Sequence, residues 1–423
     1  MLPVCTSCGE TFHDHVYACP KCHAPLLVSY DWLDGKLADE DEPGVWKYWR
    51  LLPRVEAGKR LSLGEGNTPL VKSAYLGKQL GIDELYFKLE GSNPTGSYKD
   101  RIAAVGLSWA VSQGKAACIG TSSGNAGAAA AAYAARAGIR YHLAVLEQIV
   151  PAKLSQALLH RPTVYRIASF GTDPAVGQQV FDFITEVAQT NEWEVMITAF
   201  RCNPYAMEGV KTISFEIAQR LGTAPSAVYV PAGGAGLFVG VHKGFHELHE
   251  LKLTDRKPKV TAVQPEGCSN IVKAYEAGLD HPVAGPSTTD ISGLQVPNPP
   301  DGSLALKIMH QGDGAAISVS DEEIYDAQRL LAEKEGIFCE PASAAAAAGL
   351  IRACQTEKPD PSAKVVCVLT GHGLKDDRMM AATVRSHSLP LLKVDEWKRR
   401  LMTGSDRSAS HANLSSGEEG KRL

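Results

Sequence analysis

The segment that decides the fold reads Gly91-Ser92-Asn93-Pro94-Thr95-Gly96-Ser97-Tyr98-Lys99-Asp100-Arg101. Pro94 fixes its own φ and Gly96 permits a tight bend, so a turn is predicted directly before Lys99. Ser97 is placed to cap a helix that continues over residues 101–109. A positive charge is unfavourable at the N-terminal end of a helix, which favours a neutral amine on Lys99. Such an amine can attack an aldehyde, although an isolated lysine is ordinarily a solvated surface residue.

Around this segment, short apolar runs alternate with helical runs. The apolar runs do not alternate with polar residues, as in parallel strands that are covered on both faces. Strands are predicted at 117–120, 141–146, 164–167 and 227–230, and helices at 127–137, 152–160, 175–189 and 237–250. The sequence therefore predicts an α/β fold in which helices flank mostly parallel sheets.

Several spaced motifs resemble those of one enzyme family. The Lys99 segment is similar to the cofactor-lysine motif of threonine synthases, which are fold-type II enzymes dependent on pyridoxal 5'-phosphate (PLP), like the β subunit of tryptophan synthase. The resemblance spans roughly residues 60–390, from Gly64-Glu65-Gly66-Asn67-Thr68-Pro69-Leu70 to Leu369-Thr370-Gly371-His372-Gly373-Leu374-Lys375-Asp376. It implies two α/β domains, PLP as the cofactor with a Schiff base on Lys99, a small amino acid as the substrate, and a homodimer.

The resemblance also assigns the other cofactor contacts. A glycine-rich turn follows the strand at 227–230 and precedes a helix, so its backbone N–H groups can close on a phosphate. The residues of this cradle are Gly233, Gly234, Ala235, Gly236 and Leu237. Asn125 is expected at the phenolic oxygen of PLP and Thr370 at its pyridine nitrogen. A hydroxyl at that nitrogen, in place of a carboxylate, favours expulsion of a leaving group over racemisation or transamination.

The substrate carboxylate is assigned to the turn Thr121-Ser122-Ser123-Gly124-Asn125. This turn follows a strand and precedes a helix, whose N-terminus is a favourable place for a carboxylate. By resemblance Ser122 and Ser123 bind that group, and an ordinary helix cap is the alternative. Glu340-Pro341 also matches the family, and we interpret it as a helix start with proline at the first position.

The positions that would recognise a substrate phosphate depart from the threonine synthase pattern. The family usually has arginine in Asn-Pro-x-Arg-x-Glu-Gly-Gln-Lys-Thr, where this chain has Ala206, and Val210 replaces the glutamine. Phe200 and Arg201 stand where the family often has Asn-Ser, and Arg201 could replace the missing cation.

From these departures we predict a PLP-dependent carbon–oxygen lyase or synthase. It would eliminate or replace a β-substituent on a hydroxy or O-substituted amino acid, for example an O-phospho amino acid. The alternative is threonine synthase itself, which converts O-phosphohomoserine and water to threonine and phosphate. A threonine or serine dehydratase and a PLP-binding protein without catalysis are less favoured, because Lys99, Asn125 and the cradle are intact.

Four of the ten cysteines form two CxxC pairs, Cys5/Cys8 and Cys19/Cys22, separated by ten residues. Two such pairs can present four thiolates tetrahedrally, which predicts a small ribbon with a structural zinc ion. Iron and a pair of disulfides are alternatives, and His13 or His15 could substitute as ligands. His23 follows the second pair, where such ribbons often have glycine.

The remaining composition limits partners and compartment. The net charge is −4 and there is no run of about 18 apolar residues. We therefore expect neither a nucleic-acid partner nor a membrane partner, and we expect a cytoplasmic protein. The segment 285–302, rich in Pro, Gly, Ser and Thr, is expected to be a binding or closing loop. The predicted organisation is a ribbon (1–31), a linker and the first part of the large domain (32–98, with 32–45 as linker), a smaller domain (99–211), the rest of the large domain (212–402) and a disordered tail (403–423).

Overall fold

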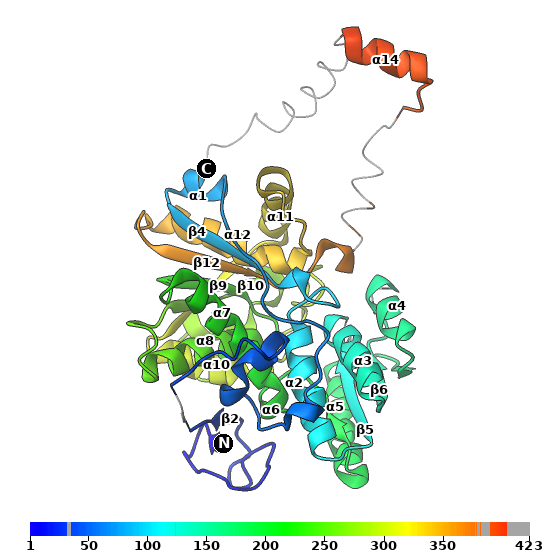
Figure 1. The fold of residues 1–423 in the computed structure, drawn as a ribbon, viewed down its shortest axis with the longest axis vertical. Helices are drawn as coiled ribbons and strands as arrows, with labels where there is room; N and C mark the ends of the chain where they lie inside the picture. The colour runs from blue at the N-terminus through cyan, green and yellow to red at the C-terminus, as the bar shows by residue number, and fades with distance from the viewer. Residues whose placement is uncertain are drawn as a thin grey trace. The chain divides into compact units, whose positions relative to one another are not determined.

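The structure, a computed structural model, describes residues 1–31, 35–122, 124–149, 151–171, 173–376, 378, 381 and 390–403, with only the backbone at 152, 153 and 174. The chain divides into a large compact unit, Met1–Asp376, and a second unit, Asp377–Leu423. The predicted domain boundaries inside the large unit stay a prediction. Its strands do form two separate larger sheets, which Figure 1 shows together with the small N-terminal hairpin.

The larger sheet has six strands in the order β11-β10-β9-β12-β4-β3. All its neighbours pair in parallel except β3 and β4, which are antiparallel. Its strands are β3 (Leu70–Lys72), β4 (Glu84–Leu89), β9 (Ala227–Pro231), β10 (Lys259–Pro265), β11 (Gly314–Val319) and β12 (Lys364–Leu369). The central strands read as nearly continuous apolar runs because both faces are covered.

The smaller sheet has four parallel strands in the order β7-β6-β5-β8. They are β5 (Ala117–Ser122), β6 (Arg140–Val145), β7 (Thr163–Arg166) and β8 (Glu194–Val195). The strands predicted at 117–120, 141–146 and 164–167 are therefore confirmed within one or two residues at each end. Every one of these parallel connections runs through a helix, as parallel pairing requires.

The helices of the large unit cover these two sheets (Figure 1). They are α1 (Leu76–Leu80), α2 (Lys99–Ser112), α3 (Asn125–Ala137), α4 (Pro151–Leu159), α5 (Pro174–Asn191), α6 (Pro204–Met207), α7 (Thr212–Leu221), α8 (Gly236–Glu250), α9 (Asn270–Glu276), α10 (Gly302–His310), α11 (Asp321–Glu335) and α12 (Pro341–Thr356). Runs of buried alanine in α3 and α12 allow close helix packing. At Gly349 in α12, an added Cβ would lie 2.5 Å from Val263 of β10, so this helix lies directly on the sheet.

The N-terminal hairpin consists of two short antiparallel strands, β1 (Leu2–Cys5) and β2 (Leu26–Ser29). Its own buried core comprises Cys5, Cys19 and Leu26. Such a small apolar core cannot stabilise an independent module, so the hairpin depends on the four cysteines and on its contacts with the large unit.

Two local predictions are wrong. The helix begins at Lys99 with Tyr98 at the N-cap, and the Ser97 hydroxyl has no hydrogen-bond partner among the described residues. The predicted linker 32–45 also ends too late, because Val45 is fully buried in the 3-10 helix Gly44–Leu51. Here the apolar side chains of Trp46 and Tyr48 pack into the core, which a short segment without a helical period does not reveal.

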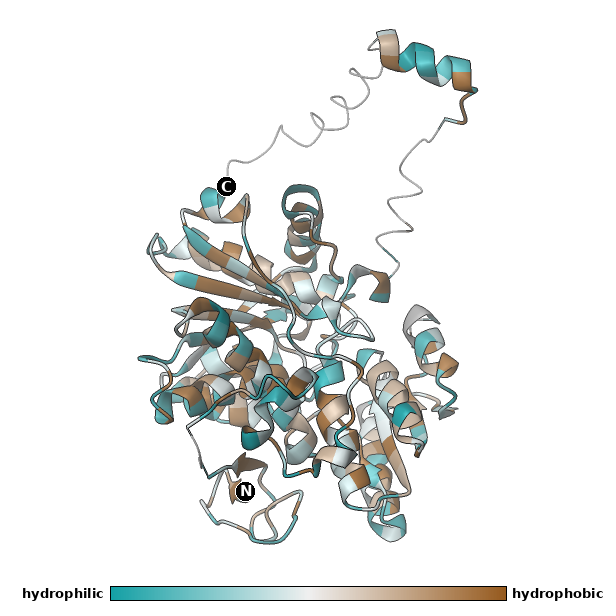
Figure 2. Cartoon of the chain, in the orientation of Figure 1, coloured by the Kyte–Doolittle hydropathy of each residue, from teal (hydrophilic) through white to brown (hydrophobic). Residues whose placement is uncertain are grey.

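In the second unit the described residues include helix α14 (Val394–Thr403). Its exposed apolar side chains include Val394, Trp397 and Leu401, and Figure 2 shows both hydrophobic (brown) and hydrophilic (teal) residues along this helix. The predicted disordered tail lies outside the described residues, apart from position 403. Among the residues that the structure places, no helix has the length and hydropathy needed to span a bilayer.

Candidate active site

Lys99 is the first residue of α2 and is half-buried. Its Nζ donates a hydrogen bond to Thr198 Oγ1 at 2.7 Å and lies 4.7 Å from the centre of the Tyr98 ring. Thr198 belongs to the turn that follows β8, 99 residues further along the chain. The lysine amine is therefore held between the two sheets, not extended into solvent.

The turn before Lys99 is fixed by a buried carboxylate. Asp100 accepts hydrogen bonds from Thr95 N at 2.8 Å and from Thr95 Oγ1 at 2.7 Å. Burial raises the pKa of Asp100 to about 7, against the lowering effect of these hydrogen bonds. Lys375 Nζ donates to the Thr95 carbonyl at 2.8 Å. Thr95, in the middle of the Asn-Pro-Thr-Gly turn, is thus fixed through its N–H, its hydroxyl and its carbonyl.

A buried ion network anchors the start of α2. The guanidinium of Arg101 donates to Glu90 at 2.7 Å and to Glu216 at 2.6 Å, and Lys88 Nζ bonds Glu216 at 2.6 Å. Burial alone would raise the pKa of Glu216, but Arg101 and Lys88 lower it to about 2. Removing one partner would leave an uncompensated buried charge, which is strongly destabilising. The network therefore fixes α2, and with it Lys99, to the large sheet.

Asn125 begins α3 directly after β5. Its Nδ2 donates to Glu340 Oε1 at 2.8 Å, while its buried Oδ1 has no hydrogen-bond partner among the described residues. An added Cβ on Gly371 would lie 2.3 Å from Glu340 Oε1 and 3.4 Å from Asn125 Nδ2. Glycine is therefore required at 371, because the Glu340 carboxylate that binds Asn125 packs directly against the Gly371 backbone.

Thr370 lies at the end of β12, next to the lysine segment. Its carbonyl accepts from Tyr98 N at 3.0 Å, and its Oγ1 is 3.0 Å from Ser343 Oγ. Ser343, near the start of α12, accepts from Gly371 N at 2.7 Å. The predicted helix start at Glu340-Pro341 is confirmed, with proline at the first position of α12. Because α12 begins at this point, Glu340 and Ser343 lie next to Asn125 and Thr370.

The glycine-rich cradle lies between β9 and α8 and is closely covered. An added Cβ would lie 2.8 Å from the Gly293 carbonyl at Gly233, and 2.6 Å from Met207 Cε at Gly236. Ala235 adopts a left-handed φ of 70°. Backbone N–H groups at a helix N-terminus favour an anion, and glycine is also required here because neighbouring segments approach the backbone.

Asp301, at the end of the segment 285–302, connects the cradle to the turn after β8. Its fully buried carboxylate accepts from Phe200 N at 2.9 Å and from Arg201 N at 3.0 Å. Asp301 N donates to the Gly234 carbonyl at 3.1 Å. Burial raises the pKa of Asp301 to about 7, although the hydrogen bonds and the Lys99 charge lower it. The segment predicted to be a binding or closing loop thus packs against the cradle.

The predicted substrate residues occupy three different situations. Ser122 Oγ accepts from Gly124 N and from Gly127 N, each at 2.8 Å, so its oxygen caps the start of α3 and its O–H is left to donate. Ser123 lies outside the described residues. Arg201 is exposed, and its guanidinium forms no hydrogen bond or ion pair within the described part of the chain.

The two departures from the family pattern are closely packed. Ala206 is 1% exposed, and an added Cβ on Gly106 of α2 would come within 2.7 Å of its methyl group. Val210 is fully buried, and an added Cβ on Gly240 of α8 would come within 2.5 Å of it. Neither position has space for a larger polar side chain pointing inward.

These residues fit PLP. The four requirements of the cofactor are a lysine amine, a phosphate cradle, a partner for the phenolic oxygen and a partner for the ring nitrogen. The amine can come from Lys99 and the phosphate cradle from the turn Gly233–Leu237. The phenolic oxygen can be bound by Asn125 and the ring nitrogen by Thr370. The buried Oδ1 of Asn125, which lacks a partner among the described residues, indicates that a polar ligand belongs beside Asn125.

The four paired cysteines come together at the tip of the hairpin. The sulfur atoms of Cys5, Cys8, Cys19 and Cys22 all lie within 4.8 Å of one another. Neither His13 nor His15 is part of this group. His15 instead contacts Trp109 with a ring separation of 4.7 Å. The cluster can therefore hold a metal ion with four sulfur ligands, as predicted.

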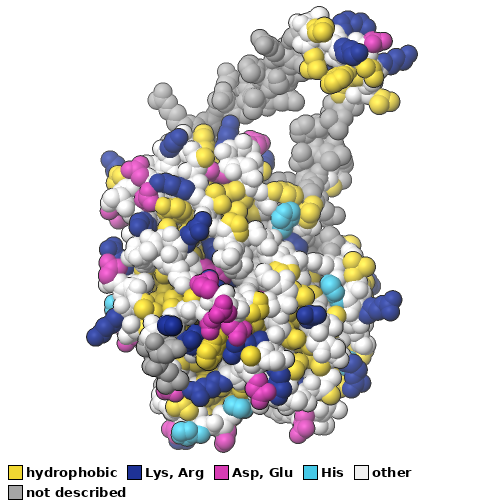
Figure 3. Space-filling model, in the orientation of Figure 1, with side chains coloured by type: hydrophobic (Ala, Val, Ile, Leu, Met, Phe, Trp, Pro, Cys, Tyr) yellow, Lys and Arg dark blue, Asp and Glu magenta, His cyan; other side chains and the backbone are white. Residues whose placement is uncertain are grey.

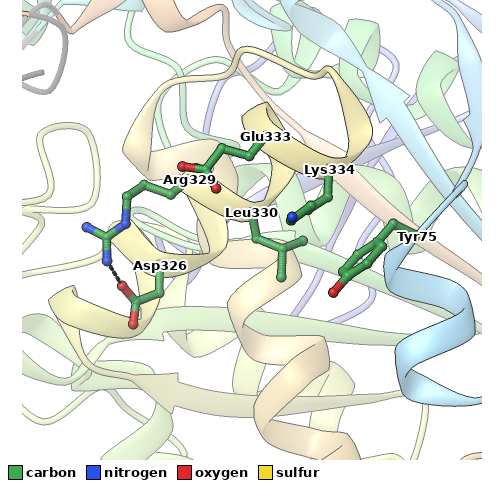
Figure 4. A pocket seen from close by; sticks show the side chains of 6 residues that line it. All are labelled: Tyr75, Asp326, Arg329, Leu330, Glu333 and Lys334. Carbon is green, nitrogen blue, oxygen red and sulfur yellow. Dashed lines mark hydrogen bonds and ion pairs between the residues drawn. The ribbon is translucent and has the colours of Figure 1, made fainter. Parts of the chain in front are cut away.

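A separate pocket of about 270 Å³ lies beside α11 and is mostly lined by charged side chains (Figure 4). Arg329 and Asp326, which form an ion pair, line it together with Tyr75, Leu330, Glu333 and Lys334. None of the residues around Lys99 lines it, so we do not assign the site there. On the face shown in Figure 3, basic and acidic side chains are interspersed, in keeping with the nearly balanced charge.

Sequence reasoning missed Thr198, Asp301, Glu340 and Ser343 as site residues. Thr198 and Asp301 stand in irregular segments, and only the fold brings them to Lys99. Glu340 and Ser343 did carry a signal, because their motif resembles the family, but it was interpreted only as a helix start.

The class of protein follows from this site and from comparison with known proteins. The family described as pyridoxal-phosphate dependent enzyme matches residues 61–371. Among solved structures, maize serine racemase has a TM-score of 0.63 at 21% identity, covering 76% of this chain and 92% of that one. The processed form of threonine deaminase isoform 2 from Solanum lycopersicum has a TM-score of 0.61 at 20% identity, covering 75% and 82%. These structures share the fold-type II architecture.

Curated relatives narrow the class. Threonine synthase of Methanocaldococcus jannaschii is 36% identical over 92% of this chain and 96% of its own length. Those of Methanosarcina acetivorans and Halalkalibacterium halodurans are 38% and 37% identical, over 88% and 80% of this chain and 91% of each relative. The chain belongs to the threonine synthase family of PLP-dependent enzymes, and it is a PLP-dependent lyase of that class.

Proposed function

We propose that this enzyme removes or replaces an oxygen-linked substituent on an L-amino acid, with Lys99 as the cofactor lysine and the proton carrier. The observation that carries the proposal is the packing of four separate segments against the lysine segment and against one another. These are the turn of Thr198, the start of α3 with Asn125, the end of β12 with Thr370, and the glycine-rich cradle with Asp301. Such a convergence of polar groups at the carboxyl ends of parallel strands is the usual arrangement of a ligand site in α/β proteins.

When bound, PLP withdraws electrons from the α-carbon of the substrate and makes its proton removable. In this chain Lys99 Nζ would accept that proton, and Thr198 Oγ1, at 2.7 Å, would keep the amine oriented. Asn125 would bond the phenolic oxygen, with Glu340 orienting its amide. Thr370 would place a hydroxyl, not a carboxylate, at the ring nitrogen, which favours loss of a leaving group over racemisation.

On the substrate side, no guanidinium at position 206 is available to bind the leaving group of the substrate. Ala206 is buried against α2, and the backbone N–H groups of Phe200 and Arg201 are already bonded to Asp301. A phosphate needs charge-assisted donors, and these positions offer none. We therefore infer that the enzyme acts on a hydroxy amino acid, or on one whose oxygen-linked substituent has other donors.

Threonine synthesis from O-phosphohomoserine is the second candidate. It is favoured by curated relatives named threonine synthase at 36–38% identity over most of the chain. For this activity the exposed guanidinium of Arg201 would have to turn toward the site and bind the substrate phosphate.

A substrate panel on the purified, PLP-loaded protein tests the proposal. O-phosphohomoserine, threonine, serine and O-phosphoserine are assayed for release of phosphate and keto acid, alongside the visible spectrum of the bound cofactor. Keto acid or a spectral change with a hydroxy or O-substituted amino acid, without threonine from O-phosphohomoserine, supports the first candidate. Threonine and phosphate from O-phosphohomoserine establish the second. A silent panel with bound PLP would contradict both.

A homodimer and a cytoplasmic location remain proposals. The homodimer rests on analogy with other fold-type II enzymes, and the location rests on composition. Sedimentation of the full chain tests the first, and fractionation of cells that express it tests the second.

A further inference from the structure

The loop between the two cysteine pairs packs against the body of the enzyme. We call residues 13–17 the docking loop. The His15 ring contacts Trp109 at 4.7 Å and Tyr205 at 6.1 Å, and His15 Nδ1 lies 3.1 Å from Gln113 Oε1. Tyr205 Oη donates to the Val16 carbonyl at 3.1 Å. Because Trp109 and Gln113 lie at the C-terminal end of α2 and Tyr205 lies on α6, the loop joins these two elements.

Tyr17 makes the most specific of these contacts. Its hydroxyl lies 2.8 and 3.1 Å from the two carboxylate oxygens of Glu194, a residue of β8 that is 1% exposed. The Trp109 indole N–H donates to the same Tyr17 oxygen at 3.2 Å. Glu194 also accepts from Asn203 Nδ2 at 2.7 Å. A buried carboxylate depends on its donors, and the ribbon supplies one of them.

The docking loop is connected to the active site through two elements, helix α2 and the turn before α6. Trp109 lies on the same fourteen-residue helix as Lys99, ten residues further along. Asn203 caps α6 by accepting from Ala206 N at 2.9 Å, and the turn before it contains Thr198, which bonds Lys99. The docking loop therefore supports both the helix that begins with Lys99 and the turn that holds its amine.

The two cysteine pairs fix both ends of this loop. The backbone N–H groups of Ser7 and Cys8 lie 3.4 Å from Cys5 Sγ, as in metal-binding knuckles. The residues after the pairs, Gly9 and His23, both have a left-handed φ, of 73° and 57°. The distances Cys5 Sγ–Cys22 Sγ and Cys8 Sγ–Cys19 Sγ are 3.4 and 3.7 Å, so each sulfur of one pair faces one of the other. Four sulfur ligands at this spacing suit a tetrahedral Zn²⁺ ion.

We infer that the four cysteines bind Zn²⁺, and that this ion keeps the docking loop on α2 and α6, so that the ribbon positions the Lys99 site. The apolar core of the ribbon, Cys5, Cys19 and Leu26, is too small to hold the loop without a cross-link. The inference about docking stands on the structure alone. Only its effect on the cofactor rests on the proposed function.

The experiment compares the purified full-length protein with the double variant Cys8→Ser/Cys22→Ser, which loses one exposed ligand from each pair. Zinc content, hydrogen exchange of peptides covering 10–20, 99–112 and 194–207, and PLP affinity are measured. One zinc ion per wild-type chain is expected. The double variant is expected to bind no zinc, to exchange faster in all three peptides and to bind PLP several-fold more weakly. Cys354→Ser, in α12, is the matched control and should keep all three properties.

A second variant separates the metal from the contact that it supports. Tyr17→Phe should keep its zinc but exchange faster at 194–207, because Glu194 loses a donor. If the double variant does not fold, zinc is removed from the folded wild-type protein with a chelator and exchange is measured on that sample.

Three results would overturn the inference. They are a wild-type protein whose four cysteines form two disulfides, a wild-type protein with no zinc, and a zinc-free protein whose exchange at 99–112 and 194–207 is unchanged. A zinc-loaded wild-type protein that does not bind PLP would instead refute the proposed function, and the exchange data would still decide the docking.

Discussion

The two sides of the active site differ in how far they follow the family. On the proposed cofactor side, Lys99, Asn125, Thr370 and the glycine-rich cradle are all present, on segments that pack against one another. On the substrate side, Ala206 and Val210 fill positions where the family usually has arginine and glutamine, and both are buried. The cofactor side fits PLP, and we propose that recognition of the leaving group has changed on the substrate side.

The physical reason for the difference lies in where the two sides sit. The cofactor residues stand at ends of parallel strands and starts of helices, where backbone geometry fixes them. The substrate side is built from the irregular turn after β8 and from the short α6. Substitutions there change the contacts without disturbing either sheet, as is common for residues in connecting segments.

The largest expected effect is that of Lys99→Ala. Removing the amine should abolish the visible absorbance of lysine-bound PLP and lower turnover by roughly 10³-fold or more, because the proton carrier is lost. Spectra and steady-state kinetics measure both. Lys78→Ala, on an exposed face of α1, is the control. If the Lys99→Ala variant kept its turnover, Lys99 would not be the cofactor lysine, and the proposed cofactor side of the site would be wrong.

The next effect is that of restoring the family arginine with Ala206→Arg. The buried site against Gly106 has no space for it, so the free energy of unfolding should fall by about 3 kcal/mol. Denaturant unfolding measures this, with Ala135→Arg on the exposed part of α3 as the control. A stable Ala206→Arg enzyme that gains affinity for O-phosphohomoserine would show that position 206 faces the substrate after all.

A smaller effect concerns pH. Asp301 in the folded protein keeps its proton up to about pH 7, whereas an unfolded Asp has a pKa of about 3.9. The folded state therefore binds more protons between these values, and this residue's contribution to stability declines as the pH rises through that window. In Asp301→Asn, stability should be lower at pH 4, because one backbone N–H loses its acceptor, and should decline less toward pH 7.

Urea unfolding at several pH values checks this prediction, with the exposed Asp280→Asn as the control. A variant whose stability still falls with pH as steeply as the wild type would mean that Asp301 does not titrate in this range. The hydrogen bonds that Asp301 accepts from the turn of Phe200 would then be made to an ionised carboxylate throughout this pH range.

The smallest expected effect is that of Arg201→Ala. The guanidinium is exposed, so KM for hydroxy amino acids should change less than about twofold, as is typical for an exposed substitution. Arg220→Ala, exposed on α7, is the control. A rise of tenfold or more in KM for O-phosphohomoserine alone would show that Arg201 replaces the missing arginine. The substrate side, like the cofactor side, would then follow the function of the family.

The sequence predicted much of this molecule for identifiable reasons. The lysine turn, the strand–turn–helix units and the paired cysteines are local patterns, and the structure has them at the predicted residues. Thr198 and Asp301 could not be predicted, because each reaches Lys99 or the cradle only through long-range packing. The prediction that Ser97 caps the helix is wrong, because a serine before a helix is often a cap but here its backbone pairs with Gly371.

The most direct test of the account is the affinity of the PLP-loaded wild-type enzyme for homoserine and for O-phosphohomoserine, measured side by side. A phosphate held by charge-assisted hydrogen bonds should tighten binding roughly tenfold or more. The account predicts no such gain, because the substrate side lacks the cation that would hold the phosphate. O-phosphohomoserine that binds at least tenfold more tightly than homoserine would contradict it.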